Sequence, residues 1–259
     1  MNDDLARVTS AHHGTSLRLA RNSAWNLVAL FATVAVHFVT VPIVIAHIGL
    51  SEFGNAGLVL ALWAPLLLVG TVVGQALTRE LSDLAMATGA AVNRRMVESA
   101  VLIWLLSTLV GGALVVSIGP LLLRALTGTT VGVPQWRWGL AIAGIGWAAQ
   151  QGSLILQGTS LAQQRFATMA GVTVASSVVS VIAILLCTAV LPDANGYLAG
   201  LTAGFAATLG SWLVVTRISG SVESLVPRAH GAEMRRLLMF GKWQGVVQLA
   251  GVIGNQIDR

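Results

Sequence analysis

The sequence predicts an all-α fold: a polytopic bundle of transmembrane helices, with one six-helix lobe and the start of a seventh span. Two observations lead to this prediction. The 259 residues are 55% apolar and only 10% charged, whereas soluble domains carry about 25% charged residues. The charged residues also lie between long apolar runs rather than within them. A soluble protein with a single apolar helix would show neither property.

The first two spans form a hairpin. The apolar runs 25–46 and 55–78 hold 22 and 24 residues. At about 1.5 Å per residue, each exceeds the roughly 30 Å of a bilayer core. Pro42 lies near the end of the first run and Pro65 lies inside the second, and both should kink their helices. Residues 1–21 are polar, and we interpret them as a cytoplasmic tail, either disordered in part or lying along the membrane surface.

Further apolar runs follow the hairpin. Spans three to six are expected over 99–118, 136–161, 167–191 and 197–216. The third span should end at Gly119-Pro120, and residues 121–126 either extend it or form a short interfacial turn. Polar connections are expected over 79–98 and 217–236, the second being a cytoplasmic loop between two lobes. A seventh run begins near Leu237 and is still helical in pattern at Arg259, so we interpret 237–259 as a truncated seventh span.

Lysine and arginine are distributed unevenly between alternate connections. Twelve lie in the tail, in the connections after the second and fourth spans, and from 217 to 242, whereas only Arg124 and Arg137 lie in the opposite connections. Cytoplasmic loops of membrane proteins carry this excess. We therefore expect a cytoplasmic N-terminus. The net charge of +5 then reflects topology, and no nucleic-acid partner is expected.

Small residues indicate close helix packing. Gly70 and Gly74 form a G-x-x-x-G motif in the second span, and Gly200 and Gly204 form another in the sixth. Such spacing lets helix backbones approach one another. The motif does not identify the partner helix.

The first span carries a polar stripe along one face. At 100° per residue its members fall within about 60° of one another; they are Asn22, Asn26, Thr33, His37 and Thr40. Two interpretations stay open, namely a helix interface joined by hydrogen bonds and one wall of a hydrophilic cavity. His37 is likewise either a hydrogen-bonded packing residue or a proton relay.

The seventh run repeats this stripe at an offset of 222 residues, with Gln244, Gln248, Asn255 and Arg259, and Asp258 flanks it. Transporters are commonly built from such internal repeats. Other polar residues at depth are Gln150, Gln151 and Gln157 in the fourth span, and Gln75, Arg79 and Glu80 at the end of the second. Arg79 and Glu80 can also simply mark the cytoplasmic interface. The candidate cavity residues are therefore Asn22, Asn26, Thr33, His37, Gln75, Arg79, Gln248, Asn255, Asp258 and Arg259.

Catalytic motifs are absent from the sequence. It contains no G-x-x-x-x-G-K-[ST], H-E-x-x-H, C-x-x-C or G-x-S-x-G pattern. No loop is long enough to hold a soluble catalytic domain. We therefore expect no enzyme activity, no cofactor and no metal.

Several short segments resemble one family of membrane proteins, the Wzx-like polysaccharide biosynthesis or O-antigen flippases of the multidrug/oligosaccharidyl-lipid/polysaccharide exporter superfamily. The segments follow the family's order over 22–259. They are 48–54 (IGLSEFG), 74–81 (GQALTREL), 156–166 (LQGTSLAQQRF), 240–244 (FGKWQ) and 255–259 (NQIDR). The last segment resembles the end of the family's seventh span, whose late aspartate corresponds to Asp258.

The resemblance implies two six-span lobes around a central cavity and an alternating-access mechanism. This chain would supply the first lobe and most of the seventh span of a protein roughly twice as long. The implied activity is translocation of an undecaprenyl-diphosphate-linked oligosaccharide to the outer leaflet of the bacterial cytoplasmic membrane. The implied partners are that lipid-linked oligosaccharide, membrane lipid, a polysaccharide polymerase and the export machinery. Polar and cationic walls would pass the sugars and the diphosphate, with Arg259 and the first span's stripe as candidates.

Three other functions are weighed against this one. A drug or metabolite antiporter of the same superfamily should carry an acidic residue deep in the first lobe, which the sequence lacks. A membrane-embedded glycosyltransferase or polymerase needs large extramembrane loops. A scaffold or anchor protein would not need polar stripes at membrane depth.

Overall fold

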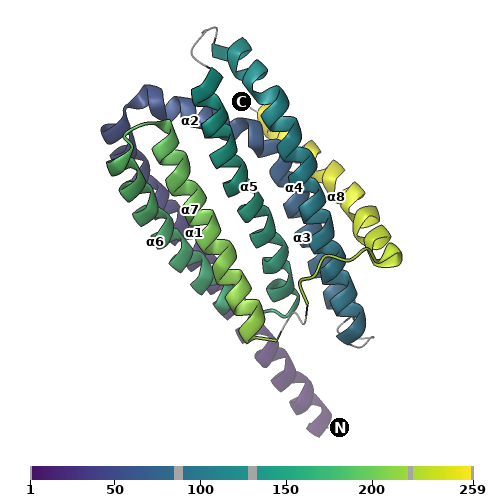
Figure 1. The fold of residues 1–259 in the computed structure, drawn as a ribbon. Helices are drawn as coiled ribbons and strands as arrows, with labels where there is room; N and C mark the ends of the chain where they lie inside the picture. The colour runs from purple at the N-terminus through teal and green to yellow at the C-terminus, as the bar shows by residue number, and fades with distance from the viewer. Residues whose placement is uncertain (1, 85–89, 128–132, 221–223, 258–259) are drawn as a thin grey trace.

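A computed structural model of the chain describes residues 2–84, 90–127, 133–220 and 224–257, and all of its regular elements there are helices (Figure 1). In chain order they are α1 (Asn2–Ile48), α2 (Leu50–Trp63), the 3₁₀ turn η1 (Ala64–Leu66), α3 (Leu67–Leu84), α4 (Ala90–Thr127), α5 (Val133–Ala162), α6 (Phe166–Val190), α7 (Ala194–Ile218) and α8 (Gly231–Ile257). The predicted all-α fold is confirmed.

Six candidate membrane spans, sought in the described residues only, match the six predicted from sequence. They are Ser23–Ile48, Leu50–Asp83, Val92–Ala125, Arg137–Ala162, Phe166–Val190 and Ala194–Ile218. Helix α8 is not among the six. Its assignment as a seventh span therefore stays a prediction.

Several element boundaries differ from the sequence-based prediction. Helix α1 begins at Asn2, so residues 2–21 continue the first span as helix; no proline interrupts them. Helix α4 passes Gly119-Pro120 and runs to Thr127, so the prediction that the third span ends there is wrong. The alternative that residues 121–126 extend this span is confirmed. Burial explains why α4 continues, because Leu123, three residues after the proline, is completely buried in a core cluster with Leu140. The polar connections are also shorter, since α3 reaches Leu84 and α8 begins at Gly231.

Pro65 breaks the second span, as expected. The break is the 3₁₀ turn η1, which separates α2 from α3. The side-chain amide of Gln151, on α5, donates a hydrogen bond to the carbonyl of Leu66 at the end of this turn. Such neighbouring donors make a broken helix tolerable in a membrane, where no water can pair with the backbone.

Helix α5 lies at the centre of the bundle (Figure 1). It is the least apolar of the six candidate spans and also the most buried. Side chains of three neighbouring helices donate hydrogen bonds to its backbone carbonyls, from Thr78 to Gly158 at 3.2 Å, from Trp104 to Ala148 at 2.9 Å and from Thr202 to Ile142 at 2.9 Å. A central helix faces protein rather than lipid, so its polar groups can be paired.

The two glycine motifs have identifiable partner helices. A Cβ atom built on Gly74 would lie 2.7 Å from the carbonyl oxygen of Leu154 on α5. One built on Gly200 would lie 2.4 Å from the Cα of Ile184 on α6. The motifs therefore set the α3–α5 and α6–α7 contacts through direct backbone approach.

A buried carboxylate joins α4 to the segment before α8. Glu98 is 1% exposed, and its oxygens lie 2.9 Å from Nε of Arg94 and 2.9 Å from Nε2 of His230. Arg94 is four positions before Glu98 on the same helix, whereas His230 is 132 positions away in sequence. Glu98 therefore fixes the chain leading into α8 against α4.

Alternate junctions gather at opposite ends of the bundle. Figure 1 shows the N-terminal part of α1, the α5–α6 junction and the beginning of α8 at one end, and the α1–α2 junction at the other. Arg165 lies in the α5–α6 junction, Arg217 in the last turn of α7 and Arg124 in the last turn of α4. The cytoplasmic position of the N-terminus, expected from the basic residues, stays a prediction.

Candidate functional site

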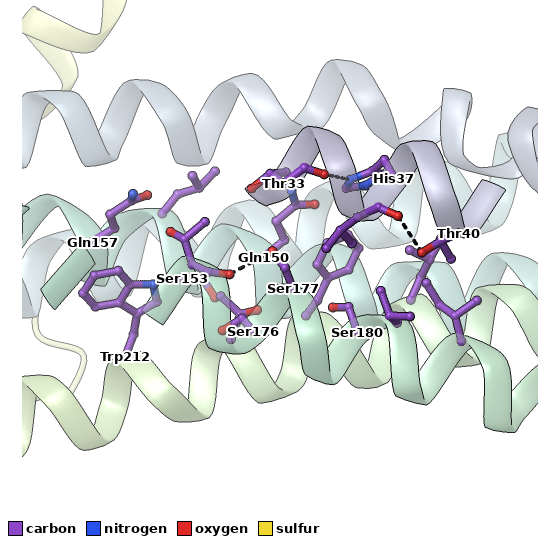
Figure 2. Close-up of a pocket in the computed structure, with 18 of the residues that line it drawn as sticks. Thr33, His37, Thr40, Gln150, Ser153, Gln157, Ser176, Ser177, Ser180 and Trp212 are labelled. Carbon is purple, nitrogen blue, oxygen red and sulfur yellow. Dashed lines mark hydrogen bonds between the residues drawn. The ribbon is translucent and has the colours of Figure 1, made fainter. Parts of the chain in front are cut away.

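A cavity of about 380 Å³ lies between α1, α5, α6 and α7 (Figure 2). This volume falls within the range of roughly 300–1,000 Å³ that is usual for small-molecule sites. Ser176 and Ser180, which line it, lie near the middle of α6. The cavity is therefore at the depth of the membrane core.

Helix α6 supplies a row of hydroxyl groups. Its polar lining residues are spaced at i, i+3, i+4 and i+7, which places them on one helical face; they are Thr173, Ser176, Ser177 and Ser180. Ser176 is 6% exposed. Within the described part of the chain, its Oγ has no hydrogen-bond partner. An unpaired hydroxyl in a membrane core is costly, so this group is available to a ligand or water.

Helix α1 supplies a wall whose polar groups are satisfied within the helix itself. Thr33 Oγ1 donates to the carbonyl of Ala29 at 2.9 Å, and Thr40 Oγ1 donates to that of Val36 at 2.7 Å. His37 Nδ1 donates to the carbonyl of Thr33 at 2.8 Å. A neutral His37 ring then keeps Nε2 as an acceptor.

Helices α5 and α7 complete the lining with amides, hydroxyls and aromatic rings. Figure 2 shows Gln150, Ser153 and Gln157 of α5 on the same cavity as Trp212 of α7. Ser153 Oγ donates to the carbonyl of Ala149 at 2.9 Å. The amide side chains therefore carry most of the hydrogen-bonding capacity that α5 directs into the cavity.

The cavity carries no formal charge from its side chains. Among the described residues that line it there is no Asp, Glu, Lys or Arg, and the polar members are hydroxyls, two amides, one imidazole, one phenol and one indole. The described chain also contains no group of three His, Cys, Asp or Glu residues able to hold a metal ion. The arrangement can bind a neutral polar molecule, and it offers neither a nucleophile with a base nor a paired carboxylate.

The sequence-predicted candidates are distributed unevenly in the fold. Thr33 and His37 line the cavity, whereas Asn26, on the same helix, is exposed and does not. Gln75 and Arg79 are exposed on α3 and lie outside the lining. The guanidinium of Arg79 instead lies 5.0 Å from the centre of the Phe240 ring.

The remaining candidates cannot be placed at the cavity. The side chains of Asn22, Gln248 and Asn255 lie outside the described set, although their backbones belong to α1 and α8. Asp258 and Arg259 lie outside the described residues altogether. The proposed role of Arg259 as a cationic wall therefore stays a prediction.

Sequence reasoning missed most of the lining. It noted Gln150 and Gln157 as polar residues at depth without placing them in the site, and it did not single out the α6 hydroxyls. The i, i+3, i+4, i+7 spacing from Thr173 to Ser180 carried that signal. Small hydroxyls often bond to their own helix, so this spacing alone could not show which face is hollow.

Comparison with known proteins gives one match. A family model described as "Polysaccharide biosynthesis protein" matches residues 19–259, which is nearly the whole chain. No curated protein and no solved structure matches significantly.

Proposed function

This chain belongs to the Wzx-like polysaccharide biosynthesis protein family, and from that premise we propose that it takes part in moving lipid-linked oligosaccharide across a membrane. The proposed mechanism is alternating access, with the sugar part passing through a polar interior while the lipid tail stays in the bilayer. The observation that carries the proposal is the neutral polar cavity enclosed by α1, α5, α6 and α7.

Energetics support a transport function for this cavity. Polar side chains in a membrane core are costly and usually face a partner or a water-filled path. Here hydroxyls and amides from four helices face one another across a space of about 380 Å³ instead of packing together. A purely structural bundle would fill that space with apolar side chains.

We place the protein in the bacterial cytoplasmic membrane with its N-terminus in the cytoplasm. The segregation of basic residues supports this orientation. The proposed substrate is an oligosaccharide on an undecaprenyl-diphosphate-type carrier, and the proposed partners are a polysaccharide polymerase and export machinery. No catalytic step is proposed.

The test is a translocation assay in proteoliposomes containing the full chain. A fluorescent polyprenyl-diphosphate oligosaccharide is incorporated, and the fraction accessible to a membrane-impermeant quencher or lectin is followed with time. We expect faster exchange between leaflets than in empty vesicles. Exchange no faster than in empty vesicles would overturn the proposal.

A cavity-filling variant connects the assay to the site. Ser177→Phe places a ring in the cavity and should slow translocation, whereas Ser117→Phe changes an exposed serine on α4 and should not. Size-exclusion profiles of both variants in detergent check that they are folded. Active exchange of a cationic drug by the wild-type protein, without movement of the lipid-linked sugar, would instead indicate the antiporter function.

A further inference from the structure

We infer that the cavity between α1, α5, α6 and α7 binds uncharged sugar units and excludes both acidic sugars and the diphosphate of the carrier. The inference rests on the proposed function, which it makes more specific. It follows from which hydrogen-bonding groups the lining still has free, and from the charges that the lining lacks.

Most hydroxyl hydrogens in the lining are already committed. Eight lining residues carry an aliphatic hydroxyl, and five of these donate to carbonyls of their own helices at 2.7–2.9 Å; the five are Thr33, Thr40, Ser153, Ser177 and Thr208. A hydroxyl that donates its hydrogen to the backbone keeps lone pairs for accepting. These five groups therefore face the cavity mainly as acceptors.

The α1 imidazole has the same character. Nδ1 of His37 donates to the carbonyl of Thr33 at 2.8 Å, so Nε2 accepts whenever it carries no hydrogen. Donors in the lining include the side-chain amides of Gln150 and Gln157 and the unpaired hydroxyl of Ser176, together with the phenol of Tyr197 and the indole N–H of Trp212. The described lining therefore offers both acceptors and donors, and none of them belongs to an Asp, Glu, Lys or Arg side chain.

A sugar matches this pattern, because each of its hydroxyls can donate to one lining group and accept from another. The aromatic rings of Tyr197, Phe205 and Trp212 in the lining offer apolar surface to the C–H faces of a pyranose ring. An uncharged sugar also brings no charge into the cavity, so it needs no charged partner there.

Anionic groups do not match it. A carboxylate or diphosphate brings only acceptors when ionised, and its binding sites are normally built from Arg, Lys, metal ions or clustered backbone N–H groups. The described lining has no Arg or Lys. Moving an unpaired anion into this space costs far more than moving a neutral hydroxyl, so the diphosphate must bind elsewhere.

The test compares two substrates that differ only at C6. Polyprenyl-diphosphate glucose and polyprenyl-diphosphate glucuronate share the lipid and the diphosphate, and both are assayed in proteoliposomes containing the full chain. We expect the glucose form to move at least about tenfold faster, the factor that corresponds to about 1.4 kcal/mol of unfavourable charge burial. Equal rates would overturn the inference and leave the proposed transport function standing.

A gain of specificity gives a result that misfolding cannot imitate. Gln157→Lys introduces a cation into the lining and should raise the ratio of glucuronate to glucose transport severalfold. The matched control is Gln164→Lys, the same change at an exposed position in the α5–α6 junction, which should leave the ratio unchanged. An equal rise in both variants would show that surface charge, rather than the cavity, controls selection.

Equilibrium binding separates the inference from the transport proposal. Methyl glucoside and methyl glucuronide are tested against the purified protein by saturation-transfer NMR, with Ser176→Ala and Ser117→Ala as site and control variants. Binding of the glucoside alone, weakened by Ser176→Ala only, supports the inference even if no lipid-linked sugar is moved. Binding of neither sugar, or of both equally, overturns it.

Discussion

Replacing Gly200 by alanine should separate α7 from α6. The added Cβ would lie 2.4 Å from the Cα and 2.8 Å from the backbone nitrogen of Ile184. Non-bonded carbon atoms rest at about 3.5–4.0 Å, so the two backbones must move apart by roughly 1 Å. Because the atoms in contact are backbone atoms, no side-chain rotation can relieve the overlap.

The expected net effect combines two opposing terms. Overpacking of this kind costs about 1–3 kcal/mol. Alanine in place of glycine in a helix interior contributes about 0.5–1 kcal/mol in the stabilising direction. We therefore expect Gly200→Ala to lower the free energy of unfolding by about 1–2 kcal/mol.

Gly210 provides a control on the same helix. A Cβ atom built there meets nothing within 4 Å, so Gly210→Ala keeps the propensity gain without the overlap. We expect it to stabilise the protein by about 0.5–1 kcal/mol. The two variants should thus change stability in opposite directions.

The assay is reversible unfolding of the full chain in mixed detergent micelles, followed by circular dichroism. Wild type, Gly200→Ala and Gly210→Ala are compared at matched protein and detergent concentrations. The reasoning is refuted if Gly200→Ala is as stable as wild type or more so, because the α6–α7 backbones would then not be in contact.

Three further predictions concern polar contacts between and within helices. Trp104→Phe removes the indole donor from the α4–α5 contact and should lower the free energy of unfolding by about 0.6 kcal/mol, and at most about 1.7 kcal/mol, in the same assay. The control Trp138→Phe, at an exposed position, should cost less. Equal costs would show that the Trp104 hydrogen bond does not stabilise the α4–α5 contact. Asp193 caps the N-terminus of α7, because its Oδ1 accepts a hydrogen bond from Gly196 N at 2.8 Å. Asp193→Ala should lower the free energy of unfolding by about 1 kcal/mol and raise hydrogen exchange in the first turn of α7. Unchanged exchange there would argue against capping. Glu98→Gln replaces the carboxylate that contacts His230 at 2.9 Å, so exchange and protease cleavage at 224–230 should increase. Protection equal to wild type would show that this contact does not hold the segment.

Hydropathy and chain length were sufficient to predict the six candidate spans, because membrane insertion depends on local composition. The break at Pro65 was also predictable, because the proline itself disrupts the helix. The same reasoning failed at Pro120, where α4 continues to Thr127. Burial of Leu123 beyond that proline depends on α5, which a local reading cannot include.

The candidate site was only partly predictable. Thr33, His37 and Thr40 of the predicted stripe line the cavity, whereas Asn26 of the same stripe does not. The sequence could not show that hydroxyls of α6 face them, because a row of serines and threonines has the same spacing whether it meets lipid, protein or a cavity. Glu98 illustrates the same limit, since its partner His230 comes from a segment 132 residues away.

The sequence by itself therefore determined the class of protein and the number of candidate spans in the described residues, both of which depend on local composition. Tertiary structure decided that α5 is the central helix, that Gly200 meets Ile184, and that four helices leave an uncharged cavity between them. These features depend on how close two backbones can come and on which faces meet. That information lies in the packing of distant segments rather than in any one of them.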